Sequence, residues 1–157
     1  MEYKNYISVA LAWDYINTLV TLFMPNYITT ELHKFQHGIP SAPENSPHIH
    51  VKPLYSAKIQ YAHDPNSYLC LQEKYFAIIQ KILGNFLYYG IGMGNTILPT
   101  LSDLASENSC STKRTAQKIT KLLNYLATNP VANLWYNSIR MILIIHSNAS
   151  YLSCSKA

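Results

Sequence analysis

Residues 82–102 carry no charged side chain, and the stretch is about as long as the roughly 20 residues that cross a bilayer. Four glycines, two asparagines and Pro99 interrupt it. A lipid-facing helix would be broken there and would leave backbone groups without partners. The stretch therefore predicts two buried helices joined by a glycine-containing loop, and it argues against the alternative of a small membrane protein.

Apolar residues spaced by three and four positions predict four helices in all. The first follows Asn26, a candidate N-cap, and the second runs from near Glu73 to about Tyr89. Gly84 lies inside the second helix, and close approach of another backbone is the simplest reason for a glycine there. The apolar stripes are Ile28, Leu32 and Phe35; Phe76, Ile79, Leu83 and Phe86; Ile97, Leu101, Leu104 and Ala105; and Ala116, Ile119, Leu123 and Leu126.

Strands are predicted at both ends of the chain. Apolar residues alternate at Ile7, Val9, Leu11 and Trp13, and a partner strand follows at 19–24, so the first two dozen residues predict a β-hairpin that turns at 14–18. Residues 133–136 and 140–147 predict two further strands. Between the first and second helices, residues 38–71 are rich in proline and without periodicity, which predicts a long loop across a neighbouring surface.

Catalytic chemistry finds little support in the residue pattern. A two-metal site needs clustered carboxylates, but the three aspartates fall on different predicted elements and no acidic residue follows Glu107. The histidine pairs at 33/37 and 48/50 have no cysteine or carboxylate at ligand spacing, so they favour ordinary polar roles over a metal site. No nucleophile motif is present. The aspartates are Asp14, Asp64 and Asp103.

Charge is distributed unevenly along the chain. From residue 113 onward there are six basic residues and no acidic one. Arg114, Lys118 and Lys121 form a stripe on the fourth helix that could follow phosphates, although a merely solvated helix face is the alternative. Three cysteines without paired spacing and the lack of a secretory signal predict an intracellular protein of the cytoplasm or nucleus.

Several sequence motifs follow one another in a characteristic order. Leu-Ala-Trp-Asp-Tyr at 11–15 and Phe-Met-Pro-Asn-Tyr-Ile at 23–28 are followed by Ile-Leu-Gly-Asn-Phe-Leu-Tyr-Tyr at 82–89. In this order they resemble copia-type retrotransposon reverse transcriptases. The first two resemble that family's hairpin ending in Met-Pro-Gly-Tyr, with Asn26 where glycine is usual, and the third resembles a helix of its thumb. Since the family's hairpin lies near the primer terminus, the resemblance implies that Trp13 and Tyr15 contact nucleic acid.

The resemblance continues into the start of an RNase H domain. Leu-Leu-Asn-Tyr-Leu-Ala-Thr-Asn-Pro at 122–130 and Ser-Asn-Ala-Ser-Tyr-Leu-Ser at 147–153 match the connecting segment and the first nuclease strand. The family's first catalytic aspartate corresponds to Asn148, which cannot supply an anionic oxygen for Mg²⁺. The family pattern also favours aspartate at the positions of Gly94, Asn124 and Arg140, so part of the basic excess reflects lost acids.

These observations together predict an α+β fold: an N-terminal β-hairpin, a thumb-like bundle of three to four helices, and C-terminal orphan strands of a truncated RNase H-like domain. The predicted boundaries are 1–130 for the reverse transcriptase part and 131–157 for the start of the nuclease part. The resemblance implies a fragment without cofactor, although intact family members use Mg²⁺.

The expected function is that of a catalytically inactive remnant of an RNA-directed DNA polymerase and RNase H polyprotein, with at most weak, nonspecific binding to nucleic-acid duplex. The alternative is a helical interaction module that docks on an intact element-encoded polymerase or capsid. The expected partners are therefore a primer–template duplex or element-encoded proteins, with neither a membrane nor a small-molecule substrate.

Overall fold

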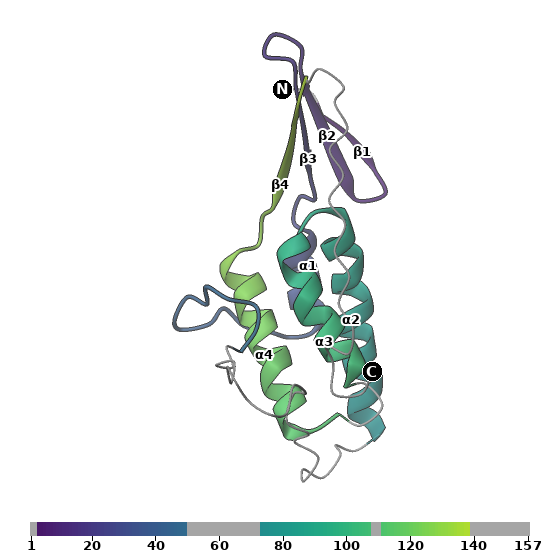
Figure 1. The fold of residues 1–157 in the computed structure, drawn as a ribbon, viewed down its shortest axis with the longest axis vertical. Coiled ribbons are helices and arrows are strands. Elements are labelled where there is room, and N and C mark those ends of the chain that lie inside the picture. Colours follow the sequence, from purple (N-terminus) through teal and green to yellow (C-terminus); the bar gives the residue numbers. More distant parts are fainter. Residues whose placement is uncertain (1–2, 50–72, 108–110, 139–157) are drawn as a thin grey trace, which may run out of the picture.

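The computed structural model describes residues 3–49, 73–107 and 111–138. The predicted strand at 140–147, the position of Asn148, the proline-rich residues 50–71, His50 and all three cysteines lie outside the described residues. The described chain is α+β: four antiparallel strands form one sheet, and four α-helices stand beside one end of it (Figure 1).

The predicted N-terminal hairpin is confirmed. Strands β2 (Val9–Asp14) and β3 (Leu19–Phe23) are antiparallel neighbours with Leu11 opposite Leu22 and Trp13 opposite Val20. Opposite residues of an antiparallel pair share a face of the sheet. The predicted alternation therefore places Val9, Leu11 and Trp13 on one face, as expected from a period of two.

One further strand, β1 (Tyr3–Tyr6), precedes the hairpin and pairs with β2, which the sequence analysis missed. Ile7 was predicted to begin the strand that became β2, but it lies in the β1–β2 turn. Ile7 and Ser8 both have positive φ, at 50° and 65°, which is the conformation of a tight two-residue hairpin turn. Isoleucine is β-branched, and β-branched residues rarely adopt a positive φ. A turn was therefore not expected at Ile7, and the alternation of apolar residues placed Ile7 in the predicted strand.

All four predicted helices are present. They are α1 (Tyr27–Lys34), α2 (Glu73–Gly92), α3 (Leu98–Ser106) and α4 (Lys113–Thr128), with a short 3₁₀ turn η1 at Asn95–Ile97. The uncharged stretch is divided between α2 and α3 as predicted, and its proline lies in the first turn of α3. None of the described helices combines the length and apolarity that a membrane crossing requires.

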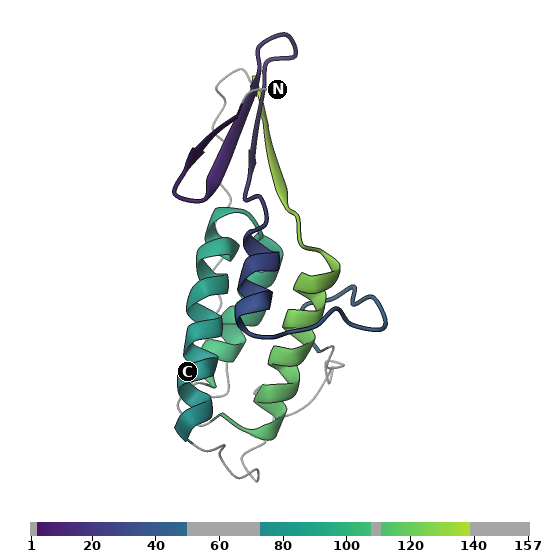
Figure 2. The same ribbon diagram turned by 180° about the vertical axis from the view of Figure 1, so that it is seen from behind.

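The helices share one apolar core, whereas the sheet extends beyond them (Figures 1 and 2). Only the helix-proximal ends of the strands reach this core, through Val9, Leu22 and Leu134. Thr112 caps α4, where its side chain accepts from the backbone N–H of Thr115. The largest fully buried apolar side chains of the helices are Ile28, Phe86, Ile97, Leu104, Leu122 and Leu126.

The strand predicted at 133–136 exists as β4 (Asn133–Asn137), but it is not an orphan strand. It follows α4 and pairs with β3, so that Leu134 lies opposite Leu22 and Tyr136 opposite Val20. The sheet order is β1-β2-β3-β4. Residues more than 100 positions apart are thereby joined in one sheet, a pairing that a local sequence pattern cannot reveal.

The explanation offered for Gly84 is wrong, because a Cβ atom built there would meet nothing within 4 Å. The most crowded glycine is Gly94, after the end of α2. A Cβ atom at Gly94 would lie 2.5 Å from Cε1 of Tyr89, and Tyr89 is itself buried and stacked on Tyr27. Gly94 therefore makes room for a fixed aromatic ring.

Two glycine-to-alanine substitutions test this assignment. Gly84→Ala is expected to raise the free energy of unfolding by about 1 kcal/mol, since alanine favours a helix and meets no obstacle. Gly94→Ala is expected to lower it by about 1 to 3 kcal/mol, because the Tyr89 ring must move. Urea denaturation of both variants measures the difference, and equal stabilities would contradict the assignment.

Candidate functional site

The predicted basic stripe on α4 is largely neutralised by acidic side chains from other elements. The ammonium group of Lys118 lies 2.6 Å from a carboxylate oxygen of Asp103 and 2.6 Å from one of Glu107. Its side chain is only 13% exposed. Lys118 therefore does not lie on a solvated helix face, which was the alternative to a phosphate-binding stripe, and it holds the end of α3 against α4.

Burial alone would lower the pKa of Lys118, but the hydrogen bonds to Asp103 and Glu107 outweigh it and raise the pKa above its usual value. Lys121 is also paired, 2.8 Å from Glu44. Glu44 belongs to the loop after α1, and its backbone N–H donates to the hydroxyl of Thr128. As predicted, the described part of the loop runs across a neighbouring surface, here that of α4.

The five residues expected to bind nucleic acid do not form one surface. Arg114 lies in the first turn of α4, whose 16 residues span about 24 Å. The segment leading to β4 follows the other end of this helix. Trp13 and Tyr15 lie toward the other end of the molecule, at the tip of the β2–β3 hairpin (Figure 1). Lys118 and Lys121 are paired to acids between these two regions.

A second polar cluster joins α1 to α2 beside the β1–β2 turn. The carboxylate of Glu31 is buried, with Lys34 at 2.6 Å and the side-chain amide of Asn85 donating to it at 2.6 Å. The hydroxyl of Tyr27 donates to the backbone carbonyl of Asn85 at 3.0 Å. Burial raises the pKa of Tyr27, and the charge of Glu31 raises it further.

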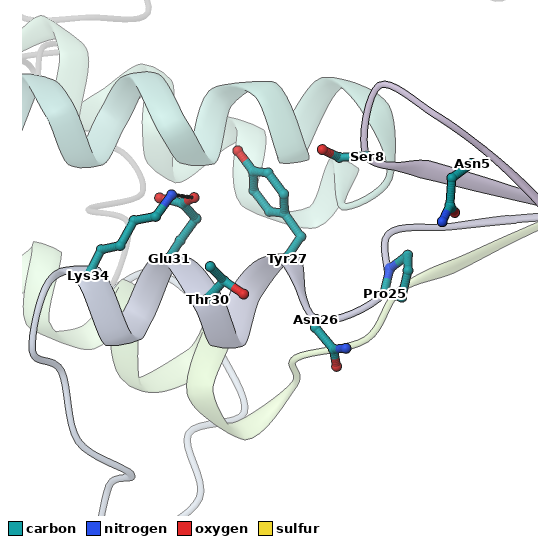
Figure 3. A pocket seen from close by; sticks show the side chains of 8 residues that line it. All are labelled: Asn5, Ser8, Pro25, Asn26, Tyr27, Thr30, Glu31 and Lys34. Carbon is teal, nitrogen blue, oxygen red and sulfur yellow. Dashed lines mark hydrogen bonds and ion pairs between the residues drawn. The ribbon is translucent and has the colours of Figure 1, made fainter.

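Figure 3 shows this cluster at the side of an open pocket. Ser8 and Asn5 reach the pocket from the sheet, while Tyr27, Glu31 and Lys34 reach it from α1. The one carboxylate is already bound by Lys34 and Asn85, so its role is to fix α1 on α2. The arrangement therefore explains packing, and it presents no activated nucleophile.

His37, another candidate ligand, also has a structural partner. Across residues 3–49, 73–107 and 111–138 there is no group of three or more histidine, cysteine, aspartate or glutamate side chains suited to a metal ion. Nε2 of His37 lies 2.9 Å from the side-chain oxygen of Asn124, which links the end of α1 to α4. The copia-type sequences that this chain resembles favour aspartate at the position of Asn124. The amide oxygen of asparagine accepts the same hydrogen bond as a carboxylate oxygen would.

The most distinctive surface in the described chain is the outer part of one sheet face. Trp13, Val20 and Tyr136 lie in one row across β2, β3 and β4, because each is opposite the next in the register. Trp13 is 38% exposed and Tyr136 is 55% exposed. We call this row the aromatic row. The resemblance implies a binding role for Trp13 but not for Tyr136, because only the β3–β4 pairing brings the two residues onto one face.

The hairpin tip beside the row exposes further apolar side chains. Tyr15 and Ile16 are 86% and 93% exposed. Their turn is fixed by Asp14, whose side chain accepts from the backbone N–H groups of Ile16 and Asn17, both at 3.0 Å, and from the side chain of Asn17 at 2.8 Å. These bonds, led by that of the Asn17 side chain, lower the pKa of Asp14 below its usual value.

The chain was compared with protein-family models, with curated proteins and with solved structures, and no match was found in any of the three comparisons.

The role of Lys118 can be tested by substitution. Lys118→Met keeps the aliphatic stem but leaves Asp103 and Glu107 without their cation, so the free energy of unfolding should fall by about 1 to 2 kcal/mol. The matched control is Arg114→Met on the same helix, which should change it by less than about 0.5 kcal/mol. Urea denaturation at neutral pH measures both values.

The pH dependence of the same variant gives an independent readout. Because the folded-state pKa of Lys118 is raised, its stabilisation is complete below the unfolded pKa of about 10.4 and is lost as pH rises through the folded value. The difference between the wild type and Lys118→Met should therefore shrink in strongly alkaline buffer. A difference that stays constant would contradict the ion-pair assignment.

The turn at Asp14 should respond to acid. Since its folded-state pKa is lowered, its contribution is present above the unfolded pKa of about 3.9 and is lost as pH falls through the folded value. The amide resonances of Ile16 and Asn17 should titrate together with a midpoint below 3.9, the approximate ordinary value. Asp14→Asn keeps the acceptor oxygen but has no proton to gain, so its amides should not titrate in this range.

Proposed function

We propose that this chain is a non-catalytic protein of copia-type reverse transcriptase lineage, corresponding to the end of the polymerase and the start of RNase H. We further propose that it acts by docking on an intact element-encoded polymerase. The observation that carries the docking role is the aromatic row of Trp13, Val20 and Tyr136, which lies uncovered by the described helices.

The local conformation at Asn26 supports the proposed lineage. In the copia-type family that the sequence resembles, the position of Asn26 in the Met-Pro-Gly-Tyr motif usually holds glycine. Asn26 is the N-cap residue of α1, as predicted, although its side chain makes no capping hydrogen bond, and its φ is 58°. Glycine and asparagine are the residues that adopt this left-handed conformation most readily, so asparagine is a mild replacement there.

The partners of the described carboxylates support a non-catalytic role. Asp14 closes its own turn, Glu31 binds Lys34 and Asn85, and Glu44 binds Lys121. Asp103 and Glu107 share Lys118. A two-metal polymerase site needs several carboxylates converging on the cations. These acids instead serve local contacts, and only Asp103 and Glu107 share a partner.

The chemistry of the sheet favours a protein partner over nucleic acid. Lys4 and Asp14 are the only charged residues in the four strands, so the sheet carries no net charge. Binding to phosphates depends on several cations, whereas protein interfaces concentrate exposed tyrosine and tryptophan. In the copia-type reverse transcriptases that this sequence resembles, the hairpin extends from the polymerase palm. An intact polymerase is therefore the partner whose surface the hairpin would fit.

Weak duplex binding is a second proposal, and it rests on the first turn of α4. Lys113 and Arg114 lie there, the turn contains no acidic residue, and neither cation is ion-paired within the described chain. Two cations at a helix N-terminus favour phosphate, although they are fewer than in most duplex-binding surfaces. The expected affinity is correspondingly low and steeply dependent on salt.

A binding experiment tests the docking proposal. The full chain is titrated against a purified, intact copia-type reverse transcriptase at about 50 mM and about 500 mM salt. We expect binding that changes little with salt, since an uncharged surface is not screened. The Trp13→Ala/Tyr136→Ala variant should bind at least about tenfold more weakly, because large aromatic residues dominate interface energetics.

The matched control is Ile78→Ala/Ile91→Ala, which removes two exposed apolar side chains from α2 and should leave the affinity within about twofold. Thermal melts confirm that both variants fold. Equal losses in both variants, or absence of binding to the polymerase, would overturn the docking proposal. Binding of an RNA–DNA duplex that falls steeply with salt and is lost in Lys113→Ala/Arg114→Ala would support the second proposal instead.

A further inference from the structure

Strand β4 is an outer strand of the sheet, with β3 on its inner side. Within the described residues, no strand pairs with its other edge. An unpaired strand edge presents backbone N–H and C=O groups to any segment that can add to the sheet.

The outward backbone groups can be identified from the register. The backbone N–H of Ser138 donates to the carbonyl of Thr18 at 3.2 Å, so Ser138 directs its backbone groups toward β3. Backbone groups alternate in direction along an antiparallel strand. Tyr136 and Leu134 therefore also bond toward β3, and Asn133, Trp135 and Asn137 direct their N–H and C=O groups outward.

This edge lacks the features that usually prevent strand addition. Its sequence, Asn-Leu-Trp-Tyr-Asn, contains no charge and no proline, and no described residue of β4 has a positive φ. The opposite edge of the sheet, β1, carries Lys4 and ends in the strained turn at Ile7 and Ser8. Charges and irregular backbone protect an edge, so β4 is the open one.

The sequence of β4 is complementary to itself when reversed. If two copies pair antiparallel about Trp135, the two Trp135 residues lie opposite each other, and Asn133 of each copy lies opposite Asn137 of the other. Leu134 then lies opposite Tyr136. A two-fold interface requires such self-complementarity, and an uncharged strand brings no like charges together across the axis.

The backbone N–H and C=O groups that β4 directs outward belong to the residues that this register pairs by hydrogen bonds. Asn133, Trp135 and Asn137 would all fall in hydrogen-bonded pairs, giving about six backbone hydrogen bonds across the axis. We propose that two copies of this chain associate through their β4 strands into one continuous eight-stranded sheet. The helices lie beyond one end of each sheet (Figure 1), so antiparallel pairing places the two helical layers at opposite ends. This interface uses the edge of the sheet and does not depend on the proposed function.

Sedimentation equilibrium of the full chain between about 1 and 100 μM tests the proposal. We expect a reversible dimer. Two double variants test the register: Asn133→Lys/Asn137→Glu places opposite charges across the two-fold axis, and Asn133→Lys/Asn137→Lys places like charges there. The first should remain dimeric, and the second should have a dimer dissociation constant higher by about tenfold or more.

Tyr6→Lys is the positional control, because Tyr6 is exposed like Asn133 and Asn137 but lies on the opposite edge of the sheet. This variant should dimerise like the wild type. Circular dichroism confirms that each variant keeps the fold. A wild type that stays monomeric at about 100 μM, or two double variants with equal dissociation constants, would overturn the proposal.

Discussion

The buried carboxylate of Glu31 fixes the position of the sheet relative to the helices. A buried charge is costly unless it is paired and hydrogen-bonded, and Glu31 receives an ammonium group from Lys34 and an amide from Asn85. These bonds anchor α1 on α2. Because α1 follows β3 after only three residues, the same anchor sets the direction in which the hairpin leaves the helical layer.

The contacts around this anchor extend the constraint to two connections at the helix-proximal end of the sheet. Tyr27 stacks on Tyr89 with ring centroids 5.9 Å apart, and the hydroxyl of Tyr88 donates to the carbonyl of Ile7 in the β1–β2 turn. Helix α2 thus holds the start of the hairpin and the start of α1 at once. The strained turn at Ile7 is retained because a helix side chain binds it.

Sequence periodicity was sufficient to predict the helices and the β2–β3 hairpin, because their apolar patterns are local. It was insufficient where the decisive partner lies far along the chain. The pairing of β4 with β3, the acids that bind Lys118, and the tyrosine ring that requires Gly94 all depend on residues from other elements. The basic stripe on α4 was recognisable in the sequence, but its neutralisation was not.

The sheet itself has an incomplete core, and this bears on both proposed surfaces. Only its helix-proximal ends pack on the apolar core of the helices, while the outer half depends on the strand ladder and on the Asp14 turn. Small sheets gain little stability without an apolar face that is covered. Covering the aromatic row by a polymerase, or extending the β4 edge by a second copy, would each supply burial or hydrogen bonds that the outer half lacks. Stability of the sheet and binding by the sheet are therefore coupled: a partner that binds only the folded sheet also stabilises it, by mass action.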